Sequence, residues 1–184
     1  MRPGALTPTP RPSPPPALDC RRGTAPEEAI AIDESLSAVL EHEHHEIDAG
    51  IEAFLEGLSL GETRMQELTR AVDALRRHIY LEEEFLFPPL QATGMIPPVL
   101  VMLREHGQIW RTLDAIQILD PDADREGARE RCGELVAQLA SHNAKEEPII
   151  YPQGDAVLTD EAKRDLRGFI DSGRMPQGWV CAQA

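Results

Sequence analysis

The chain has 184 residues, of which 41% are hydrophobic and 4% aromatic, and its 32 acidic and 18 basic residues give a formal net charge of −14. A chain of this length fits one compact domain with tails. Because an acidic chain without a dense Lys/Arg patch repels phosphate groups, we expect neither nucleic acid nor an anionic membrane surface as a partner.

Two further features favour a cytoplasmic protein. No apolar run approaches the ~18 residues that span a bilayer, and the basic start lacks the apolar stretch of a secretory signal. The three cysteines are far apart and form no Cys-x-x-Cys pair, so we predict free thiols. We expect Cys20 and Cys181 in flexible tails, and Cys132 buried on an apolar helical stripe.

Residues 1–29 contain half of the sixteen prolines and few residues that could form a core. This composition predicts a disordered, partly polyproline-like leader without chemistry of its own. A docking peptide for a proline-binding domain is the alternative, but the irregular spacing of the prolines favours plain disorder.

Apolar residues then recur at spacings of three and four, which predicts helices. The first helix has Asp33 or Ser35 as its N-cap and ends before Gly61. The second begins at about Thr63 and is terminated by Pro88-Pro89, since proline lacks the N–H that continues a helix.

Two more helices follow. The third begins at Pro97-Pro98, where proline suits a first turn, and ends before Asp120-Pro121. The fourth is capped by Asp122 or Asp124 and runs toward Pro148.

Four amphipathic helices of about twenty residues with short loops predict an all-α fold, an antiparallel up-down four-helix bundle over residues 33–152. Residues 153–184 form a C-terminal tail with a short extra helix, from Thr159 as N-cap to Gly173. We expect its apolar residues to pack over one end of the bundle, because so short a helix is unstable alone. Contact with a partner is the alternative.

The predicted bundle contains an internal repeat. Its first half is Glu43-His44-x-x-Ile47, then His78-x-x-x-Glu82-Glu83 and Phe87-Pro88; its second half is Glu105-His106-x-x-Ile109, then His142-x-x-x-Glu146-Glu147 and Tyr151-Pro152. The two histidines of a half are 34 and 36 residues apart, and ten residues separate the second histidine from the proline in both halves.

The repeat places acidic groups on a core face. A histidine and a glutamate four residues apart differ by about 40° around a helix, so both reach the same point. Glu82 and Glu146 continue the apolar stripes of their helices, and a buried carboxylate normally binds a proton or a cation. Imidazole with carboxylate suits iron, manganese or zinc, and the lack of cysteine ligands disfavours structural zinc. Two metals that each hold two histidines and share both glutamates would use every donor.

Other polar residues near the repeat have simpler interpretations. His42 and His45 lie about 200° and 100° around the helix from His44, so we expect both on the surface. Glu83 and Glu84 are expected to be solvated or to accept hydrogen bonds from the imidazoles. We expect Trp110 in the core rather than as a pocket wall.

The order His, His-x-x-x-Glu, His, His-x-x-x-Glu resembles the hemerythrin-like (HHE cation-binding) family over Asp33–Tyr151. This resemblance implies a four-helix bundle around an oxo- or hydroxo-bridged non-haem centre of two irons per chain. Such centres bind oxygen, nitric oxide or peroxide, or serve iron handling and sensing. By the resemblance, the metal ligands are His44, His78, Glu82, His106, His142 and Glu146.

Two differences from the oxygen-carrying hemerythrins bear on function. The carriers have a fifth histidine four residues from the third-helix ligand, where this chain has Met102 and Trp110, so we do not expect reversible oxygen carriage. Without that histidine, the two irons should have equal numbers of donors. The carriers also place the last carboxylate five residues after its histidine, at Glu147 here. The four-residue step of the first half favours Glu146, with Glu147 as the alternative.

Two other classes of protein remain for comparison. A ferritin-type oxidase carries Glu-x-x-His twice; Glu41-x-x-His44 fits once, but Leu103 stands before His106, so this hypothesis fails on symmetry. A non-catalytic iron sensor, whose bundle is stabilised by metal and whose tails recruit partners, is the alternative function. We expect a di-iron protein that binds a small ligand for sensing, detoxification or iron handling, and both turnover and simple binding remain open.

Overall fold

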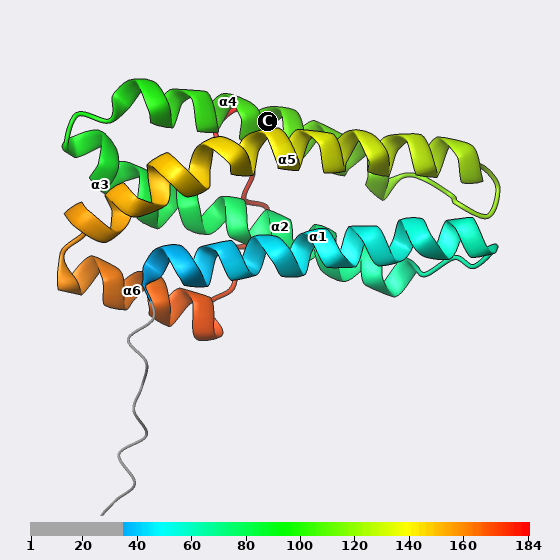
Figure 1. The fold of residues 1–184 in the computed structure, drawn as a ribbon, viewed down its shortest axis with the longest axis horizontal. Coiled ribbons are helices and arrows are strands. Elements are labelled where there is room, and N and C mark those ends of the chain that lie inside the picture. The colour runs from blue at the N-terminus through cyan, green and yellow to red at the C-terminus, as the bar shows by residue number, and fades with distance from the viewer. Residues whose placement is uncertain (1–34) are drawn as a thin grey trace, which may run out of the picture. The chain divides into compact units, whose positions relative to one another are not determined.

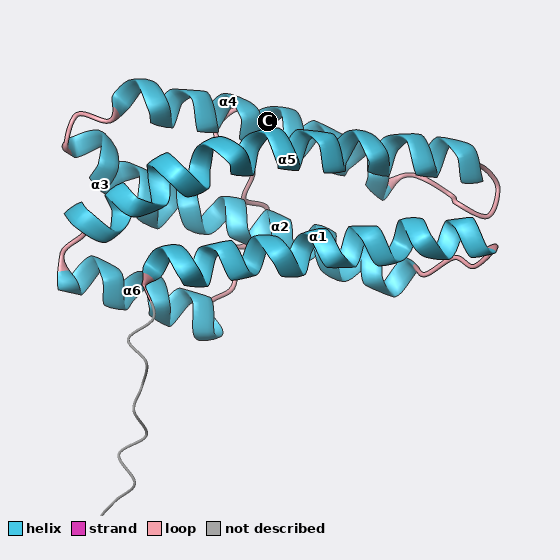
Figure 2. Cartoon of the chain, viewed as in Figure 1, coloured by secondary structure: helices cyan, strands magenta, loops and turns pink. Residues whose placement is uncertain are grey.

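The computed structural model describes residues 35–184, and this part of the chain is all-helical with no strand (Figure 2). The predicted leader and Cys20 lie outside the described residues. The elements in chain order are α1 (Leu36–Leu60), α2 (Met65–Leu81), the π-helical segment η1 (Glu82–Leu86), α3 (Phe87–Ala92), α4 (Ile96–Gln117), α5 (Arg125–Val157) and α6 (Asp160–Ser172).

Side-chain caps and a left-handed glycine fix the predicted helix ends. Ser35 is the N-cap of α1 and its hydroxyl accepts a hydrogen bond from the Ala38 amide at 3.1 Å. Gly61 ends the helix with φ 85, a conformation that side chains disfavour. Asp124 caps α5 by accepting from the Gly127 amide at 2.9 Å.

The prediction that Pro88-Pro89 ends the second helix is wrong, because helical backbone continues to Ala92. Directly before the prolines the chain widens into η1, where the Phe87 amide donates to the Glu82 carbonyl five residues back. Both prolines then stand in the first turn of α3, where a missing N–H costs little.

The expected end of the fourth helix near Pro148 is also wrong, since α5 runs through Pro148 and Pro152 to Val157. The prolines are one turn apart on the exposed face, where water can hydrate the carbonyls that lose their donors. The opposite face is buried, with Ile150 and Tyr151 at 1% and 0% exposure. This burial stabilises the helix beyond the prolines.

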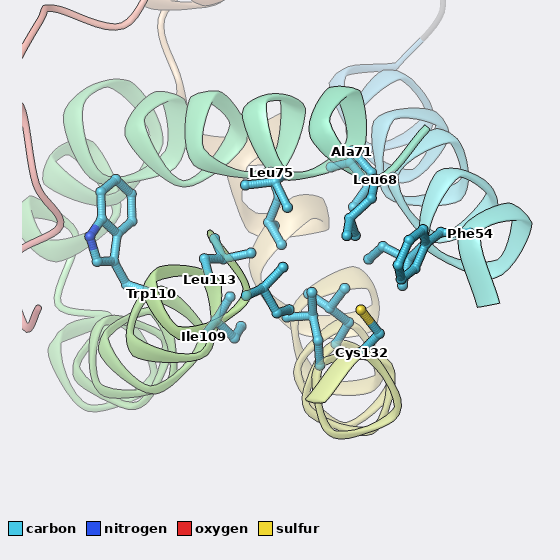
Figure 3. Packing of buried hydrophobic residues seen from close by; sticks show 14 of the residues in the cluster. Phe54, Leu68, Ala71, Leu75, Ile109, Trp110, Leu113 and Cys132 are labelled. Atoms are coloured by element: carbon cyan, nitrogen blue, oxygen red, sulfur yellow. The ribbon is translucent and has the colours of Figure 1, made fainter. Parts of the chain in front are cut away.

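The long helices α1, α2, α4 and α5 lie side by side (Figure 1). Helix α1 packs against α2 and α5, and α4 packs against α5 and α2. One apolar cluster includes Phe54, Leu75, Leu113 and Cys132, which point into the space between these helices (Figure 3). A second cluster lies nearer the start of α1, around Leu40 and α3. Between the two clusters, the helices carry buried polar side chains.

Helix α6 packs on the second cluster, as predicted. Thr159 caps it by accepting from the Ala162 amide at 3.2 Å, and Leu166 is fully buried. The apolar face of α6 is therefore part of the core and is not left exposed for a partner.

The expectation of a flexible tail around Cys181 is wrong, because Cys181 is buried against the first cluster. Trp179 packs edge-on against Trp110 with ring centroids 5.5 Å apart. Gly107 has no side chain, and a Cβ there would collide with the Gln183 carbonyl. The close approach of residues 179–183 to α4 thus depends on one glycine.

Candidate metal centre

The six predicted site residues come together between the two apolar clusters. His44 lies on α1, His78 on α2, Glu82 at the start of η1 and His106 on α4, while α5 supplies both His142 and Glu146. None of the six is more than 4% exposed. The structure therefore brings the whole predicted set into one buried region.

The six residues form two groups that share their carboxylates. The groups are His44, His78, Glu82 and Glu146, and Glu82, His106, His142 and Glu146. Within each group, the candidate ligand atoms lie within 4.8 Å of one another. Each group has two imidazoles and two carboxylates.

Glu82 faces both groups at once. Its Oε1 lies 3.2 Å from His78 Nε2, and its Oε2 lies 3.3 Å from His106 Nε2. Glu146 has the matching position on α5, with its Oε2 at 2.9 Å from His142 Nε2 and 3.7 Å from His44 Nε2. The four-residue step from histidine to glutamate places both partners on one helix face.

A carboxylate lies behind each of the four imidazoles, on the Nδ1 side. The pairs are His44 with Glu147 at 3.0 Å, His78 with Glu43 at 2.9 Å, His106 with Glu83 at 2.9 Å and His142 with Glu105 at 3.2 Å. A proton held on Nδ1 by a carboxylate leaves the Nε2 lone pair pointing to the middle of the site. The carboxylates therefore orient the imidazoles as donors.

The four pairs of an imidazole with a carboxylate at its Nδ1 follow the internal repeat. Glu43 and Glu105, which precede the first histidine of each half, contact the second histidine of their own half. Glu83 and Glu147, which follow the inner glutamates, contact the first histidine of the other half. Glu147 thus corresponds to Glu83, behind an imidazole, whereas Glu146 corresponds to Glu82.

The site contains buried polar atoms without a hydrogen bond from any described residue. Within residues 35–184, Glu82 Oε2, His106 Nε2 and Glu146 Oε1 have no partner in hydrogen-bond geometry. Such atoms are costly in an apolar interior. Because two of them are acidic oxygens and one is an imidazole nitrogen, a cation fits the donors present.

The charges of the site depend on one another. Burial opposes the protonated form of His78, but the Glu82 and Glu43 carboxylates outweigh it and raise its pKa to about 10. His142 also has its pKa raised to about 10, because Glu146 and Glu105 overcome the same effect of burial. The neighbouring imidazoles hold the pKa of Glu82 well below its usual range, although burial alone would raise it. In the absence of a metal, protons on His78 and His142 therefore compensate the buried carboxylates.

Tyr151 is a site residue that the sequence analysis missed. Its hydroxyl donates to Glu82 Oε1 at 2.8 Å and lies 2.8 Å from His44 Nε2 and 3.1 Å from His78 Nε2. Phe87 has the matching place in the first half of the repeat, and its ring stacks on His106 with centroids 5.4 Å apart. The pairing of Phe87-Pro88 with Tyr151-Pro152 was the available signal. Among the described residues, the two groups therefore differ in their surroundings, since only one of them has a hydroxyl beside its imidazoles.

The other side chains singled out near the repeat lie outside the two groups of donors. His42 and His45 are exposed, as predicted. Of the two interpretations for Glu83, the acceptor is confirmed, since its side chain is 4% exposed and faces His106. Glu84 accepts from Trp179 Nε1 at 3.0 Å, and Trp110 is in the core at 2% exposure.

Comparisons with known proteins identify this arrangement with one family. A model of the hemerythrin HHE cation-binding domain matches residues 33–153, more than half of the chain. Comparisons with curated proteins and with solved structures gave no significant match. Among the described residues, no helix is both long and apolar enough to cross a membrane.

Proposed function

Because the chain belongs to the hemerythrin HHE cation-binding domain family, we propose that residues 33–152 are an antiparallel four-helix bundle built around a non-haem di-iron centre. The domain limits come from the sequence: residues 1–29 precede the bundle and residues 153–184 follow it, although the last bundle helix, α5, itself runs to Val157. The pairwise packing of α1, α2, α4 and α5 supports the bundle.

The proposed ligands are the six predicted residues. Two histidines belong to each iron, and Glu82 and Glu146 serve both. The observation that carries this proposal is the sharing of the two carboxylates between two groups of donors. Six protein donors are too many for one tetrahedral ion, and the described residues place no thiolate in the two groups, so iron suits the site better than structural zinc.

The proposed ligand of the centre is a small molecule: oxygen, nitric oxide or peroxide. None of the six residues exposes more than 4% of its surface, so an extended organic substrate has no open approach to them. The oxygen carriers have a fifth histidine four residues from the third-helix ligand. This chain has Met102 and Trp110 at the positions four residues before and after His106, which argues against reversible oxygen carriage. Sensing, detoxification or iron handling in the cytoplasm is the proposed setting.

Exposure of the iron-loaded protein to each small ligand tests this function. We expect the reduced protein to oxidise quickly in air and to bind nitric oxide, and the oxidised protein to react with peroxide. Glu82→Ala, which should lose metal, is the control for reactions of loosely bound iron. A stable, reversible oxygen adduct would contradict the proposal and favour a carrier.

An iron-sensing regulator is the second candidate, and the C-terminal tail favours it. The Ala182 amide donates to Glu83 Oε2 at 2.8 Å, and the other oxygen of Glu83 faces His106. A change at His106 can therefore reach the tail through one carboxylate. A regulator predicts that proteolysis of residues 174–184 differs between iron-loaded and metal-free protein, whereas equal cleavage rates would argue against it.

A further inference from the structure

The Tyr151 hydroxyl lies beside both imidazoles of the His44 and His78 group and beside the two shared carboxylates. Its oxygen is 2.8 Å from His44 Nε2, 2.8 Å from Glu82 Oε1, 3.1 Å from His78 Nε2 and 3.4 Å from Glu146 Oε2. The side chain is completely buried. Every donor of this group therefore has the phenol oxygen as a near neighbour.

These distances resemble the separations among the donors themselves. His78 Nε2 and Glu82 Oε1 are 3.2 Å apart, and His44 Nε2 and Glu146 Oε2 are 3.7 Å apart. Two atoms bound to one metal at about 2.1 Å and at right angles are about 3 Å apart. The phenol oxygen thus has the spacing of another donor in the same group, unlike the four outer carboxylates, which face the Nδ1 atoms.

In the part of the chain that the structure describes, no comparable atom lies beside the imidazoles of the other group. Phe87 and Tyr151 each follow the second histidine of their half by nine residues. Phe87 presents a ring to His106, while two of the unsatisfied atoms, Glu82 Oε2 and His106 Nε2, belong to this side. At this matching position, the two halves of the repeat therefore differ only by the hydroxyl oxygen that Tyr151 has and Phe87 lacks.

We propose that Tyr151 is a seventh protein ligand, bound to the metal of the His44 and His78 group, and that this makes the two metal positions unequal. This inference depends on the proposed di-iron function. When Tyr151 binds, its O–H bond breaks, the proton leaves to bulk water and an oxygen lone pair forms the bond to the metal, with no change in oxidation state. The His106 and His142 group keeps four protein donors and is the position that receives the small ligand.

The optical spectrum of the ferric protein tests this inference, because a tyrosinate bound to Fe(III) has a charge-transfer band in the visible range. We expect this band in the unmodified chain and its loss in Tyr151→Phe, with two irons retained in both. Tyr80, the other tyrosine of the chain, packs against Trp179 with ring centroids 5.1 Å apart. Tyr80→Phe is therefore the matched control and should keep the band.

The difference between Phe87 and Tyr151 also suggests a second variant, in which a phenol is added instead of removed. Phe87→Tyr places a phenol at the matching position beside His106. The Phe87→Tyr/Tyr151→Phe double variant should recover a visible band that Tyr151→Phe lacks. Nitric oxide titration should find one binding iron in the unmodified chain and two in Tyr151→Phe.

Resonance Raman spectroscopy of the unmodified chain needs no variant, and excitation within the band should enhance tyrosinate ring vibrations. Two bound irons without these vibrations, or a band that survives in Tyr151→Phe, would overturn the inference while leaving the di-iron function in place. Tighter iron binding by Tyr151→Phe would also overturn it, because the hydroxyl would then compete with the metal. Failure of the unmodified chain to bind iron would overturn both proposals.

Discussion

Adjacent glutamates have different surroundings at the end of each His-x-x-x-Glu-Glu motif. Glu146 is fully buried and faces His142 Nε2, whereas the Glu147 side chain is 32% exposed and faces His44 Nδ1. A direct ligand and an orienting acceptor should respond differently to the loss of charge. Substitutions at Glu146 and Glu147 can therefore show which of the two glutamates is the metal ligand.

The first prediction compares Glu146→Gln with Glu147→Gln. We expect Glu146→Gln to lose at least one iron, because it removes the proposed shared carboxylate. Glu147→Gln should still bind two irons, with affinity weakened about 10–100-fold, as is typical when an imidazole loses its orienting acceptor. Metal analysis after dialysis against a graded chelator measures both. Loss of an iron in Glu147→Gln alone would move the ligand to Glu147.

The second prediction uses the three neighbouring histidines of α1. His44→Ala should lose iron, because His44 is buried and faces the shared carboxylates. His42→Ala and His45→Ala should keep both irons, since these side chains are exposed. The iron-to-protein ratio of the three purified variants decides the point, and iron loss in His45→Ala with retention in His44→Ala would reverse the register.

Sequence alone predicted the six inner residues because helical spacing and the repeat place them on core faces. It assigned no role to Tyr151, since a tyrosine in an apolar stripe has the same periodicity as the phenylalanine that it replaces in the repeat. It also left Glu43 and Glu105 without a function. Their contacts cross from one helix to the next, and these contacts depend on packing distances that spacing along the chain does not contain.

Helix ends were predictable where a side chain caps them and unpredictable where proline is tolerated. Ser35, Gly61, Asp124 and Thr159 each satisfy or end a backbone segment by a local interaction. Pro88 and Pro148 do not end their helices, because η1 and the exposed face of α5 accommodate the missing donors. Capping residues can be recognised in the sequence, whereas the packing that lets a helix continue past a proline cannot.

The third prediction concerns the packing of residues 179–183 on α4. Gly107→Ala should destabilise the protein by about 1–3 kcal/mol, because the added methyl group overlaps the Gln183 backbone. Gly133→Ala is the control: Gly133 is an exposed residue of α5 with open space around it, so alanine should stabilise the helix by about 0.5–1 kcal/mol. Urea unfolding measures both. Equal stabilisation by the two substitutions would show that the tail does not pack at Gly107.

The whole molecule couples protonation, metal binding and stability. In metal-free protein the pKa values of His78 and His142 are raised to about 10, above the value of about 6.5 that a histidine has in an unfolded chain. Their contribution to stability is therefore fully present below about pH 6.5 and is lost as the pH rises through about 10. A bound metal replaces these protons, so metal affinity should rise over the same range.

The fourth prediction follows from the competition between protons and metal for His78 and His142. Raising the pH from about 7 to about 10 should lower the free energy of unfolding of the chelator-treated protein. Over the same range the iron-loaded protein should gain stability relative to the metal-free form. Urea unfolding of both forms at several pH values checks this. Parallel curves for the two forms would show that metal and protons do not compete for these imidazoles.

The fifth prediction is the number of irons that the whole chain binds. Anaerobic titration of metal-free protein with Fe(II), followed by desalting and metal analysis, should saturate at about two irons per chain, because two groups of donors share Glu82 and Glu146. Saturation at one iron, or stable loading by zinc alone, would contradict the shared-carboxylate centre.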